Sequence, residues 1–429
     1  MCMAVDNSRL KGFFQLSVEE RRSILAEIAS LSVEDIASLE SGGGMDSTTA
    51  DTMIENVYTT MSLPVGVATN FIIDGEDFVI PFCLEESSVI AAASNMAKRC
   101  HLNGGFSTDV DESMMIGQIQ LLGIEDLKSS SEALESRAQE IIALCNSLPS
   151  TMVRLGGGCK RIECRIIEDM LIVHIIVDCK DAMGANAVNT MAELCTPLVE
   201  EISGGDARVR IVSNLAIHRL ARSTATFTPE EMSIDGSIES GLEVISGILD
   251  AYRFASIDPF RATTHNKGTM NAISSIALAC GQDWRAIEAS CHAWVTYNQG
   301  RYGSITEWKQ DEEGNLRGSI EIPLAVGIVG GAASVHPVAR ANLSILGVDS
   351  ASQLAGVMAS AGLAQNLAAM RALATSGIQS GHMKLHVRNM AVSAGAMENE
   401  VEQVAKVANE SGQRITQSLV DGILRSLRG

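Results

Sequence analysis

Asp258-Pro-Phe-Arg-Ala-Thr-Thr-His-Asn-Lys-Gly-Thr-Met-Asn271 is too polar for a core strand and too irregular for an amphipathic helix, so we predict a loop. Four of its side chains suit ligand binding: Arg261, His265, Lys267 and Asn271. The guanidinium of Arg261 can form two parallel hydrogen bonds with a carboxylate. Lys267, followed by Gly268, offers an ammonium group with room for close approach, and Asn271 adds a neutral donor and acceptor. From these residues alone, an ordinary surface loop and a ligand-binding loop are equally supported.

Length and composition limit the class of protein. A chain of 429 residues that is 46% hydrophobic should fold into two or three globular domains. The net charge of −20 argues against nucleic acid as a partner, because phosphate contacts need clustered Lys and Arg. The ten Cys include no CxxC pair, so we expect reduced thiols, no metal site and a cytoplasmic location. The longest uncharged run, residues 322–339, is broken by Pro and Gly, so no membrane helix is expected.

The clearest order of elements lies between Met115 and Ser213. Alternating or buried apolar runs predict strands at 115–122, 161–167, 170–178 and 208–213, and helical periodicity predicts helices at 131–148 and 186–202. This β-α-β-β-α-β order is that of the ferredoxin-like split unit. We predict an α+β protein with a small domain of residues 113–215, inserted in a large helical domain of residues 1–112 and 216–376. Residues 377–429, amphipathic at their end, would form a mobile helical flap.

The large domain carries further signals. Strand patterns around Asp74-Gly75 and within residues 301–323 predict two hairpins. Capping boxes predict helix starts at Ser17 and Ser240, and residues 350–375 read as one long Ala-rich helix.

Two short motifs lie at the starts of predicted helices. Glu85-Glu86 precedes an Ala-rich helix that Ser87 or Ser88 would cap. Either both side chains are solvated surface acids near a helix start, or one of them is buried and protonated and acts as an acid. Asp181-Ala-Met-Gly-Ala-Asn186 lies where a buried strand meets a helix, and Gly184 permits a tight turn there. Free N–H groups at that helix start could bind a phosphate, although the signal is weak by itself.

Two other segments carry titratable groups. Asp283 is either a helix-start acid or a partner that keeps Lys267 charged. Gly381-His-Met-Lys-Leu-His386 places two His four residues apart beside a predicted hinge at Gly377 and Gly381, with no third metal ligand evident. His382 is thus either a surface residue or a proton donor on a closing flap.

Taken together, these motifs resemble the soluble, class II hydroxymethylglutaryl-coenzyme A (HMG-CoA) reductases. The stretch around Lys267 is similar to the family's lysine motif. The family's companion motifs occur in the expected order on both sides of it, between about residues 53 and 390: Glu55-Asn-Val57, Glu85-Glu86 with the following Ser-Ser-Val-Ile-Ala-Ala-Ala-Ser, Asp181 to Asn186 with Asn189-Thr-Met-Ala192, Gly281-Gln-Asp-Trp284, Gly362-Leu-Ala-Gln-Asn366 and Gly381-His-Met383.

The resemblance implies a reaction and its residues. Two reduced nicotinamide cofactors would convert HMG-CoA to mevalonate and free coenzyme A (CoA). The implied catalytic residues are Glu86, Lys267, Asp283 and His382. Lys267 would stabilise the oxyanions, Asp283 would orient Lys267, Glu86 would transfer a proton, and His382 would protonate the departing thiolate. The implied substrate-binding residues are Ser88, Arg261 and Asn271. The implied cofactor-binding residues are Asp181, Met183, Gly184, Asn186 and Asn189. The family also implies a homodimer with sites at the subunit interface.

The sequence departs from the family in ways that bear on its ligands. Some members that prefer NADH carry an acid at the end of the small-domain helix, whereas Cys145-Asn-Ser-Leu-Pro149 has none. The choice between NADPH and NADH therefore stays open, with NADPH slightly favoured. Arg9 and Lys11 are expected to contact the CoA phosphates. A non-catalytic acyl-CoA-binding protein on the same fold is the alternative, although the four implied catalytic residues argue against it. A Cys-based acyltransferase using Cys291-His292 is disfavoured because adjacent residues on a helix point apart.

Overall fold

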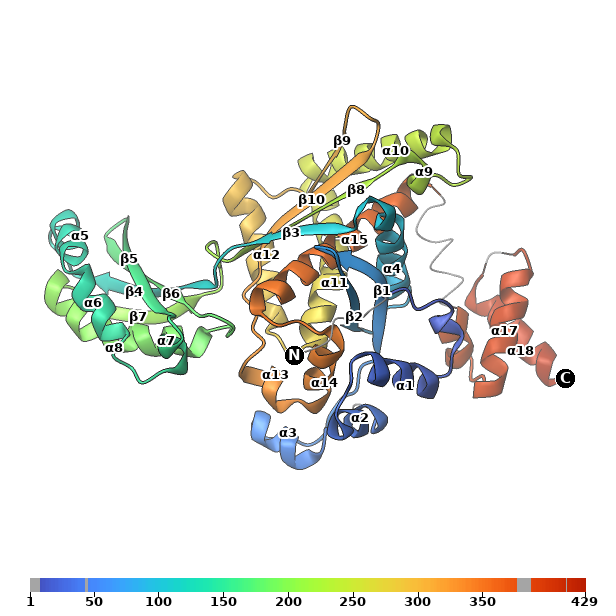
Figure 1. The fold of residues 1–429 in the computed structure, drawn as a ribbon, viewed down its shortest axis with the longest axis horizontal. Helices are drawn as coiled ribbons and strands as arrows, with labels where there is room; N and C mark the ends of the chain where they lie inside the picture. The colour runs from blue at the N-terminus through green and yellow to red at the C-terminus, as the bar shows by residue number, and fades with distance from the viewer. Residues whose placement is uncertain (1–7, 43–44, 376–386, 414) are drawn as a thin grey trace.

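The structure is a computed structural model of the chain and describes residues 8–42, 45–375, 387–413 and 415–429. Figure 1 shows an elongated molecule: a central part with a large sheet, a smaller part with its own sheet at one end, and a helical part near the C-terminus at the other. Each part has its own hydrophobic core. The predicted α+β class is confirmed, whereas the boundaries at residues 112, 215 and 376 stay predictions.

The central sheet has six strands in the order β2-β1-β3-β8-β10-β9. They are β1 (Val65–Ile73), β2 (Glu76–Cys83), β3 (Phe106–Val110), β8 (Leu220–Phe227), β9 (Thr306–Gln310) and β10 (Leu316–Pro323). Neighbouring strands are antiparallel except β1 and β3. Both predicted hairpins are confirmed, and Asp74 and Gly75 take positive φ angles of 51° and 85° in the β1–β2 turn. Such angles are typical of two-residue hairpin turns.

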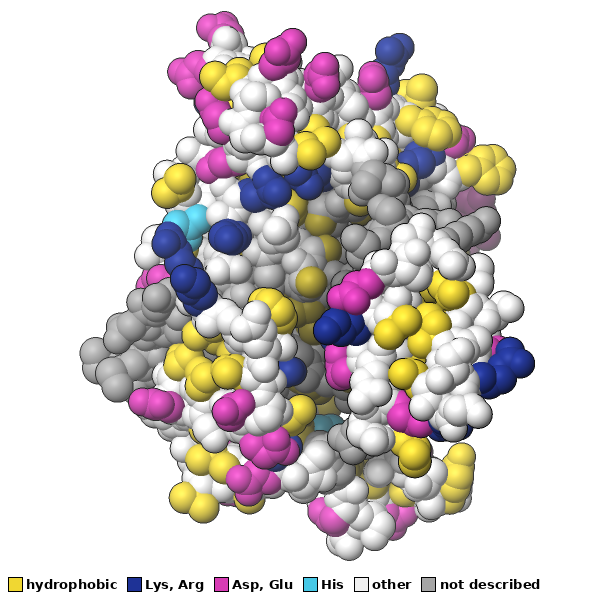
Figure 2. All heavy atoms as spheres, turned by 90° about the vertical axis from the view of Figure 1, so that its right-hand side faces the viewer, with side chains coloured by type: hydrophobic (Ala, Val, Ile, Leu, Met, Phe, Trp, Pro, Cys, Tyr) yellow, Lys and Arg dark blue, Asp and Glu magenta, His cyan; other side chains and the backbone are white. Residues whose placement is uncertain are grey.

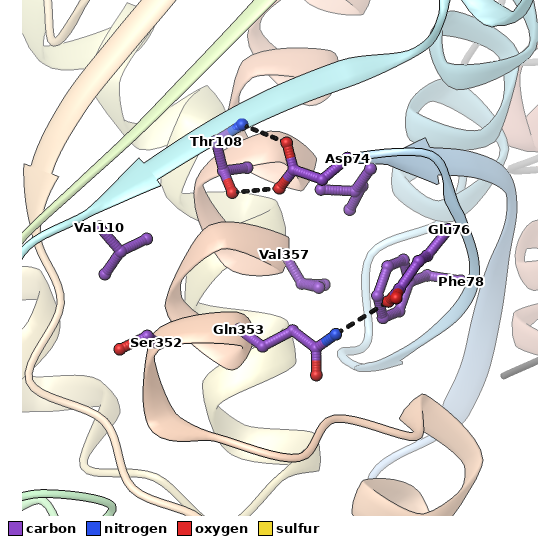
Figure 3. Close-up of a pocket in the computed structure, with 9 residues that line it drawn as sticks. Asp74, Glu76, Phe78, Thr108, Val110, Ser352, Gln353 and Val357 are labelled. Atoms are coloured by element: carbon purple, nitrogen blue, oxygen red, sulfur yellow. Dashed lines mark hydrogen bonds between the residues drawn. The ribbon is translucent and has the colours of Figure 1, made fainter. Parts of the chain in front are cut away.

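The β1–β2 turn is fastened to the rest of the sheet around a pocket of about 300 Å³ (Figure 3). The Asp74 carboxylate accepts hydrogen bonds from the backbone N–H of Thr108 (2.8 Å) and from its hydroxyl (2.5 Å). Gln353, in the first turn of α15 (Ala351–Ala374), donates to Glu76 at 3.0 Å. Both acids are therefore occupied in holding the hairpin against β3 and α15.

Helix α15 is the centre of the large part. Sixteen of its 24 residues are buried, and it packs against α4 (Val89–Arg99), α10 (Ile238–Ile257), α11 (Pro259–Ala279) and strand β8. Small residues allow this close packing: a side chain at Gly356 would collide with Thr108, and one at Gly362 would collide with Ile273. The long helix predicted for residues 350–375 is confirmed, with Ser350 as its N-cap.

The loop predicted for residues 258–271 is wrong, because these residues form the first half of α11. Asp258 caps this helix by accepting a hydrogen bond from the backbone N–H of Arg261 (3.1 Å), and Pro259 occupies its first turn. The pattern looked irregular because α11 buries polar side chains as well as apolar ones. His265, Asn266 and Thr269 are at most 3% exposed.

The smaller part confirms the predicted β-α-β-β-α-β order. Its antiparallel sheet has the order β5-β6-β4-β7, with strands β4 (Met114–Leu122), β5 (Gly158–Ile167), β6 (Met170–Asp178) and β7 (Asp206–Ser213). The second predicted helix is α8 (Ala185–Ser203). The first is divided at Arg137 into α5 (Leu127–Ser136) and α6 (Ala138–Cys145), followed by α7 (Thr151–Arg154). Arg137 has non-helical angles and pairs with Glu140 and Glu201.

Further elements of the described chain are η1 (Phe13–Gln15), α1 (Val18–Ile28), α2 (Val33–Glu40), α3 (Ser47–Met53), η2 (His101–Asn103), α9 (Pro229–Met232), α12 (Trp284–Gln299), α13 (Gly331–Val335), α14 (Pro337–Leu346), α17 (Glu398–Glu410) and α18 (Gln417–Arg428). The capping box at Ser17 is confirmed. The start predicted at Ser240 is wrong, because Ser237 caps α10. Within the described ranges, no helix is long and apolar enough to cross a membrane.

Candidate active site

Lys267 and Glu86 meet although they are far apart in the sequence. Lys267 lies on α11, and Glu86 lies in the turn between β2 and α4. The Lys267 Nζ is 3.0 Å from the Glu86 Oε2. The two side chains are 62% and 39% exposed, so their contact is open to a ligand. An ammonium group next to a carboxylate can stabilise an oxyanion and exchange a proton with it.

The predicted substrate-binding residues lie on the same two elements. Arg261 is in the first turn of α11, and burial lowers the pKa of its guanidinium. Asn271 is partly buried, one helical turn after Lys267. Ser88 occupies the N-cap position of α4 with a φ of 74°, but its side chain does not make the predicted capping hydrogen bond. Helix α11, which carries Arg261 and Asn271, contacts helix α4, which begins after Ser88.

A groove of about 1310 Å³ begins at Ser87 and Ser88. Figure 2 shows a hollow with Lys and Arg side chains at its rim. The basic residues that line the groove come from the N-terminal segment, from α4 and η2, and from the C-terminal part: Arg9, Lys11, Lys98, His101 and Arg388. Arg388 pairs with Glu402 at 2.7 Å, and the remaining Lys and Arg side chains, on a chain of net charge −20, favour an anionic ligand.

The turn between β6 and α8 contains the predicted cofactor-binding residues. Gly184 is the N-cap of α8 with a φ of 96°, and a Cβ there would overlap Cys179. Asn186 is exposed in the first turn of the helix, beside backbone N–H groups that suit a phosphate. Asp181 accepts a hydrogen bond from the backbone N–H of Ala351 at 2.9 Å. The turn is therefore attached to the start of α15 as well as to the small sheet.

Two further predicted cofactor residues, Met183 in the turn and Asn189 within α8, have partners in the structure. Met183 is partly buried, and its backbone carbonyl accepts a hydrogen bond from Arg219 at 3.1 Å. The Asn189 side-chain oxygen accepts from the backbone N–H of Val212 at 2.8 Å, which ties α8 to β7. Asn189 thus has a structural partner within the small part.

The chain matches known proteins over most of its length. The family model for hydroxymethylglutaryl-coenzyme A reductase matches residues 17–387. The 3-hydroxy-3-methylglutaryl-coenzyme A reductase of Archaeoglobus fulgidus is 50% identical over 411 residues, which are 95% of this chain and 92% of that protein. This chain belongs to the HMG-CoA reductase family. It is accordingly an NAD(P)-dependent oxidoreductase, and the resemblance inferred from its motifs is confirmed.

Further HMG-CoA reductases agree with this assignment. The probable enzyme of Borreliella burgdorferi is 32% identical, with 89% of this chain and 86% of that protein covered. An HMG-CoA reductase structure from Streptococcus pneumoniae superposes with a TM-score of 0.82 at 38% identity, covering 97% of this chain and 99% of that one. Another structure from that organism, a class II enzyme bound to NADPH, gives 0.81 at the same identity, covering 96% and 100%. The alternative of a non-catalytic binding protein receives no support.

Asp283, one of the expected catalytic residues, lies at the start of α12. Asp283 caps α12 by accepting from the backbone N–H of Ala286 (3.1 Å), and it lies 3.6 Å from Arg285. Its expected contact with Lys267 stays a prediction. His382 lies outside the described residues, together with the proposed hinge at Gly377 and Gly381.

Sequence reasoning missed the residues that hold the turn between β6 and α8. Arg219, which is 2% exposed, donates to the carbonyl oxygens of Ala182 (3.2 Å), Met183 (3.1 Å) and Val326. A side chain at Gly327 would overlap the backbone at Met183. The only signal in the sequence is the set of glycines that interrupt residues 322–339.

Neither a metal site nor a reactive thiol is evident in the parts of the chain that the structure describes. No group of three or more His, Cys, Asp or Glu side chains there is arranged to hold a metal ion. Cys291 is buried, and burial raises the pKa of its thiol. His292 contacts Glu288 and Tyr302. These positions argue against the acyltransferase hypothesis.

Proposed function

We propose that this chain reduces HMG-CoA to mevalonate and free CoA, with Lys267 and Glu86 at the reacting carbonyl. The 3.0 Å contact between their side chains is the observation that carries the proposal. The reduced nicotinamide supplies the hydride when it is bound. Lys267 stabilises each developing oxyanion, and Glu86 transfers the proton that the oxygen requires. Asp283 orients Lys267, and His382 protonates the CoA thiolate, which prevents the thiolate from adding back to the aldehyde.

The two ends of the substrate have different partners in this proposal. Arg261, Asn271 and Ser88 hold the carboxylate and hydroxyl of the HMG group, since a partly buried guanidinium suits a carboxylate. The basic groove that begins at Ser88 takes the CoA portion, whose phosphates need positive charge. Lys98 and Arg388 join the expected Arg9 and Lys11 there. The other products and ligands, mevalonate and CoA, occupy the same surfaces.

The turn at Asp181 to Asn189 takes the nicotinamide dinucleotide. The absence of a Cβ at Gly184 and the exposed start of α8 fit a phosphate group. We expect NADPH to be preferred to NADH, because the end of α6 offers no acid for a ribose 2′-hydroxyl. Asn146 at this point donates to and accepts from the backbone of Cys159 (2.9 and 2.8 Å). The class II enzyme structure from Streptococcus pneumoniae that is bound to NADPH supports a nicotinamide cofactor.

The working unit is proposed to be a homodimer with each site at the subunit interface. Large apolar side chains are exposed where α10 meets α11, close to the site: Phe254 (53%), Ile257 (60%) and Phe260 (85%). Exposed apolar surface of this kind favours association with another copy. A cytoplasmic location is also proposed, supported by the nine described cysteines, all of which are free thiols.

The proposal is tested by Lys267→Ala in the full chain. Loss of one preorganised group that stabilises an oxyanion typically lowers kcat by about 10²–10³-fold. Lys128→Ala, which removes an 84% exposed lysine of α5, is the matched control and should retain activity. Turnover of HMG-CoA is followed by nicotinamide absorbance, and folding is checked by circular dichroism. Undiminished kcat in a folded Lys267→Ala protein would refute the role of Lys267.

A further inference from the structure

Glu288 on α12 is held in a hydrogen-bonded cluster that none of the roles given above uses. The Ser274 hydroxyl donates to Glu288 Oε1 at 2.7 Å. His292, one helical turn further along α12, has its Nε2 3.3 Å from Glu288 Oε2. On the other side of the ring, His292 Nδ1 is 2.7 Å from the Tyr302 hydroxyl, and the two rings are stacked. The Glu288 carboxylate is thus fixed through both of its oxygens.

The cluster adjoins the helix that carries Lys267. Lys267, Asn271 and Ser274 are spaced four and three residues apart on α11, so they lie along one face of that helix. Glu288 is bonded to the last residue of this stripe. It therefore places a carboxylate at the end of the row of side chains proposed to contact the substrate.

The surroundings of Glu288 keep its carboxylate ionised. Burial acts to raise its pKa, but hydrogen bonds from His292 and Ser274 and the charges of His292 and Lys267 outweigh burial. The pKa of Glu288 consequently lies below its ordinary value. Lys267 is thus one of the positive charges that favour the ionised form of Glu288.

A carboxylate that stays ionised solves a problem created by the proposed chemistry. Glu86 must carry a proton when it acts as an acid, and a neutral Glu86 no longer offsets the charge of Lys267. Lys267 must remain an ammonium to stabilise the oxyanion. Two carboxylates near one ammonium can divide these tasks if one stays ionised and the other exchanges a proton.

We propose that Glu288 is a positioning residue of the active site, which keeps Lys267 protonated and aimed while Glu86 exchanges its proton. The inference rests on the proposed function of Lys267 and Glu86. His292 and Tyr302 hold Glu288 from behind, and Ser274 holds it from α11. The charged groups placed around Lys267 are then Glu86 from the turn before α4, Glu288 from α12, and Asp283, the N-cap of α12, whose contact with Lys267 belongs to the proposed function.

The experiment compares the full-length wild type with Glu288→Gln. The variant should lower kcat about tenfold, with KM for HMG-CoA changed less than about twofold, since tenfold corresponds to about 1.4 kcal/mol of transition-state stabilisation. The alkaline limb of kcat/KM should move to lower pH by about one unit, as expected when an ammonium loses a nearby negative charge. Glu243→Gln, which neutralises an exposed glutamate of α10, is the matched control and should leave the profile unchanged.

A second measurement does not depend on turnover. The pKa of Lys267 is followed by NMR after ¹³C reductive methylation, with Lys267→Arg used to assign its signal. Glu288→Gln should lower this pKa, and Tyr302→Phe, which removes only the hydroxyl behind His292, should lower it less. If Glu288→Gln does not fold, Ser274→Ala and Tyr302→Phe provide the comparison.

The possible results separate the two proposals. An inactive wild type counts against the proposed function, whereas the NMR measurement still tests Glu288. An unchanged Lys267 pKa in Glu288→Gln, or in both substitute variants, overturns the positioning role. A lower kcat without any movement of the pH profile or of the Lys267 pKa indicates a merely structural role and also overturns it.

Discussion

Replacing Arg219 with methionine should weaken nicotinamide binding far more than it weakens acyl-CoA binding. Methionine keeps most of the length of the side chain but donates no hydrogen bond. The carbonyl oxygens of Ala182, Met183 and Val326 would lose the guanidinium that now donates to them. Two of these carbonyls belong to the turn that is proposed to bind the cofactor, and none belongs to the basic groove.

The expected loss of stability in Arg219→Met follows from the burial of Arg219, which is 2% exposed. A buried acceptor that loses its donor costs about 1–3 kcal/mol, so three cost about 3–9 kcal/mol. Relief from burying a charge, which lowers the pKa of Arg219 to about 10, offsets part of this sum. We expect a net loss of about 3 kcal/mol in stability. If half of this affects the turn, KM for the cofactor rises about tenfold.

The assay measures initial rates while each substrate is varied in turn, together with unfolding in urea. Arg222→Met is the matched control, because Arg222 follows Arg219 closely, is partly exposed and pairs with Asp111 and Glu321. Each partly exposed ion pair is worth only about 0–1 kcal/mol, so the control should change KM little. An unchanged KM for the cofactor in a folded Arg219→Met protein would refute the claim that Arg219 shapes this turn.

Three further predictions concern the turn, the core and the groove. Gly184→Ala should cost at least about 2 kcal/mol in unfolding free energy, because the backbone φ is 96° and the new Cβ would overlap Cys179. Gly204→Ala, at the open end of the same helix, is the control and should cost about 1 kcal/mol. Burial, aided by the charge of Arg261, lowers the pKa of His265 to about 3. Below about pH 6.5 the unfolded chain therefore binds a proton on His265 that the folded chain does not, and the free energy of unfolding should fall by up to about 1.4 kcal/mol per pH unit. Urea unfolding of His265→Gln between pH 7 and pH 5 should lack this component, and an equal slope in both proteins would contradict the assignment. Lys98→Glu should raise KM for HMG-CoA about tenfold, more at low salt than at high salt, and a KM independent of salt would argue against phosphate binding in the groove.

The small sheet and the hairpins could be predicted because strand alternation and turn residues act locally. β6 (Met170–Asp178) is a continuous apolar run with the bounds expected from the sequence, and Asp74-Gly75 forms the expected turn. The polar half of α11 could not be predicted in this way. Its His265 bonds with Ser304 (2.8 Å) and Asn366 (2.9 Å), partners 39 and 101 residues away, and these contacts make a polar helix face part of the core.

The sequence offered candidate residues for the site but not the contacts between them. The family motifs identified Lys267 and Glu86, and the structure brings them together. The sequence did not indicate Arg219 or Glu288, because the importance of each depends on elements distant in the chain. Arg219 acts through the carbonyls of a turn more than thirty residues earlier, and Glu288 acts through a serine of the preceding helix.

The most direct measurement is the stoichiometry of the reaction. Purified protein is mixed with a limiting amount of HMG-CoA and excess NADPH, in parallel with NADH, and cofactor oxidised is compared with mevalonate formed. We predict two cofactor molecules oxidised for each mevalonate, with one free thiol released and a faster rate with NADPH. Oxidation of one cofactor per product, or no oxidation by a folded protein that binds HMG-CoA, would contradict the proposed reduction.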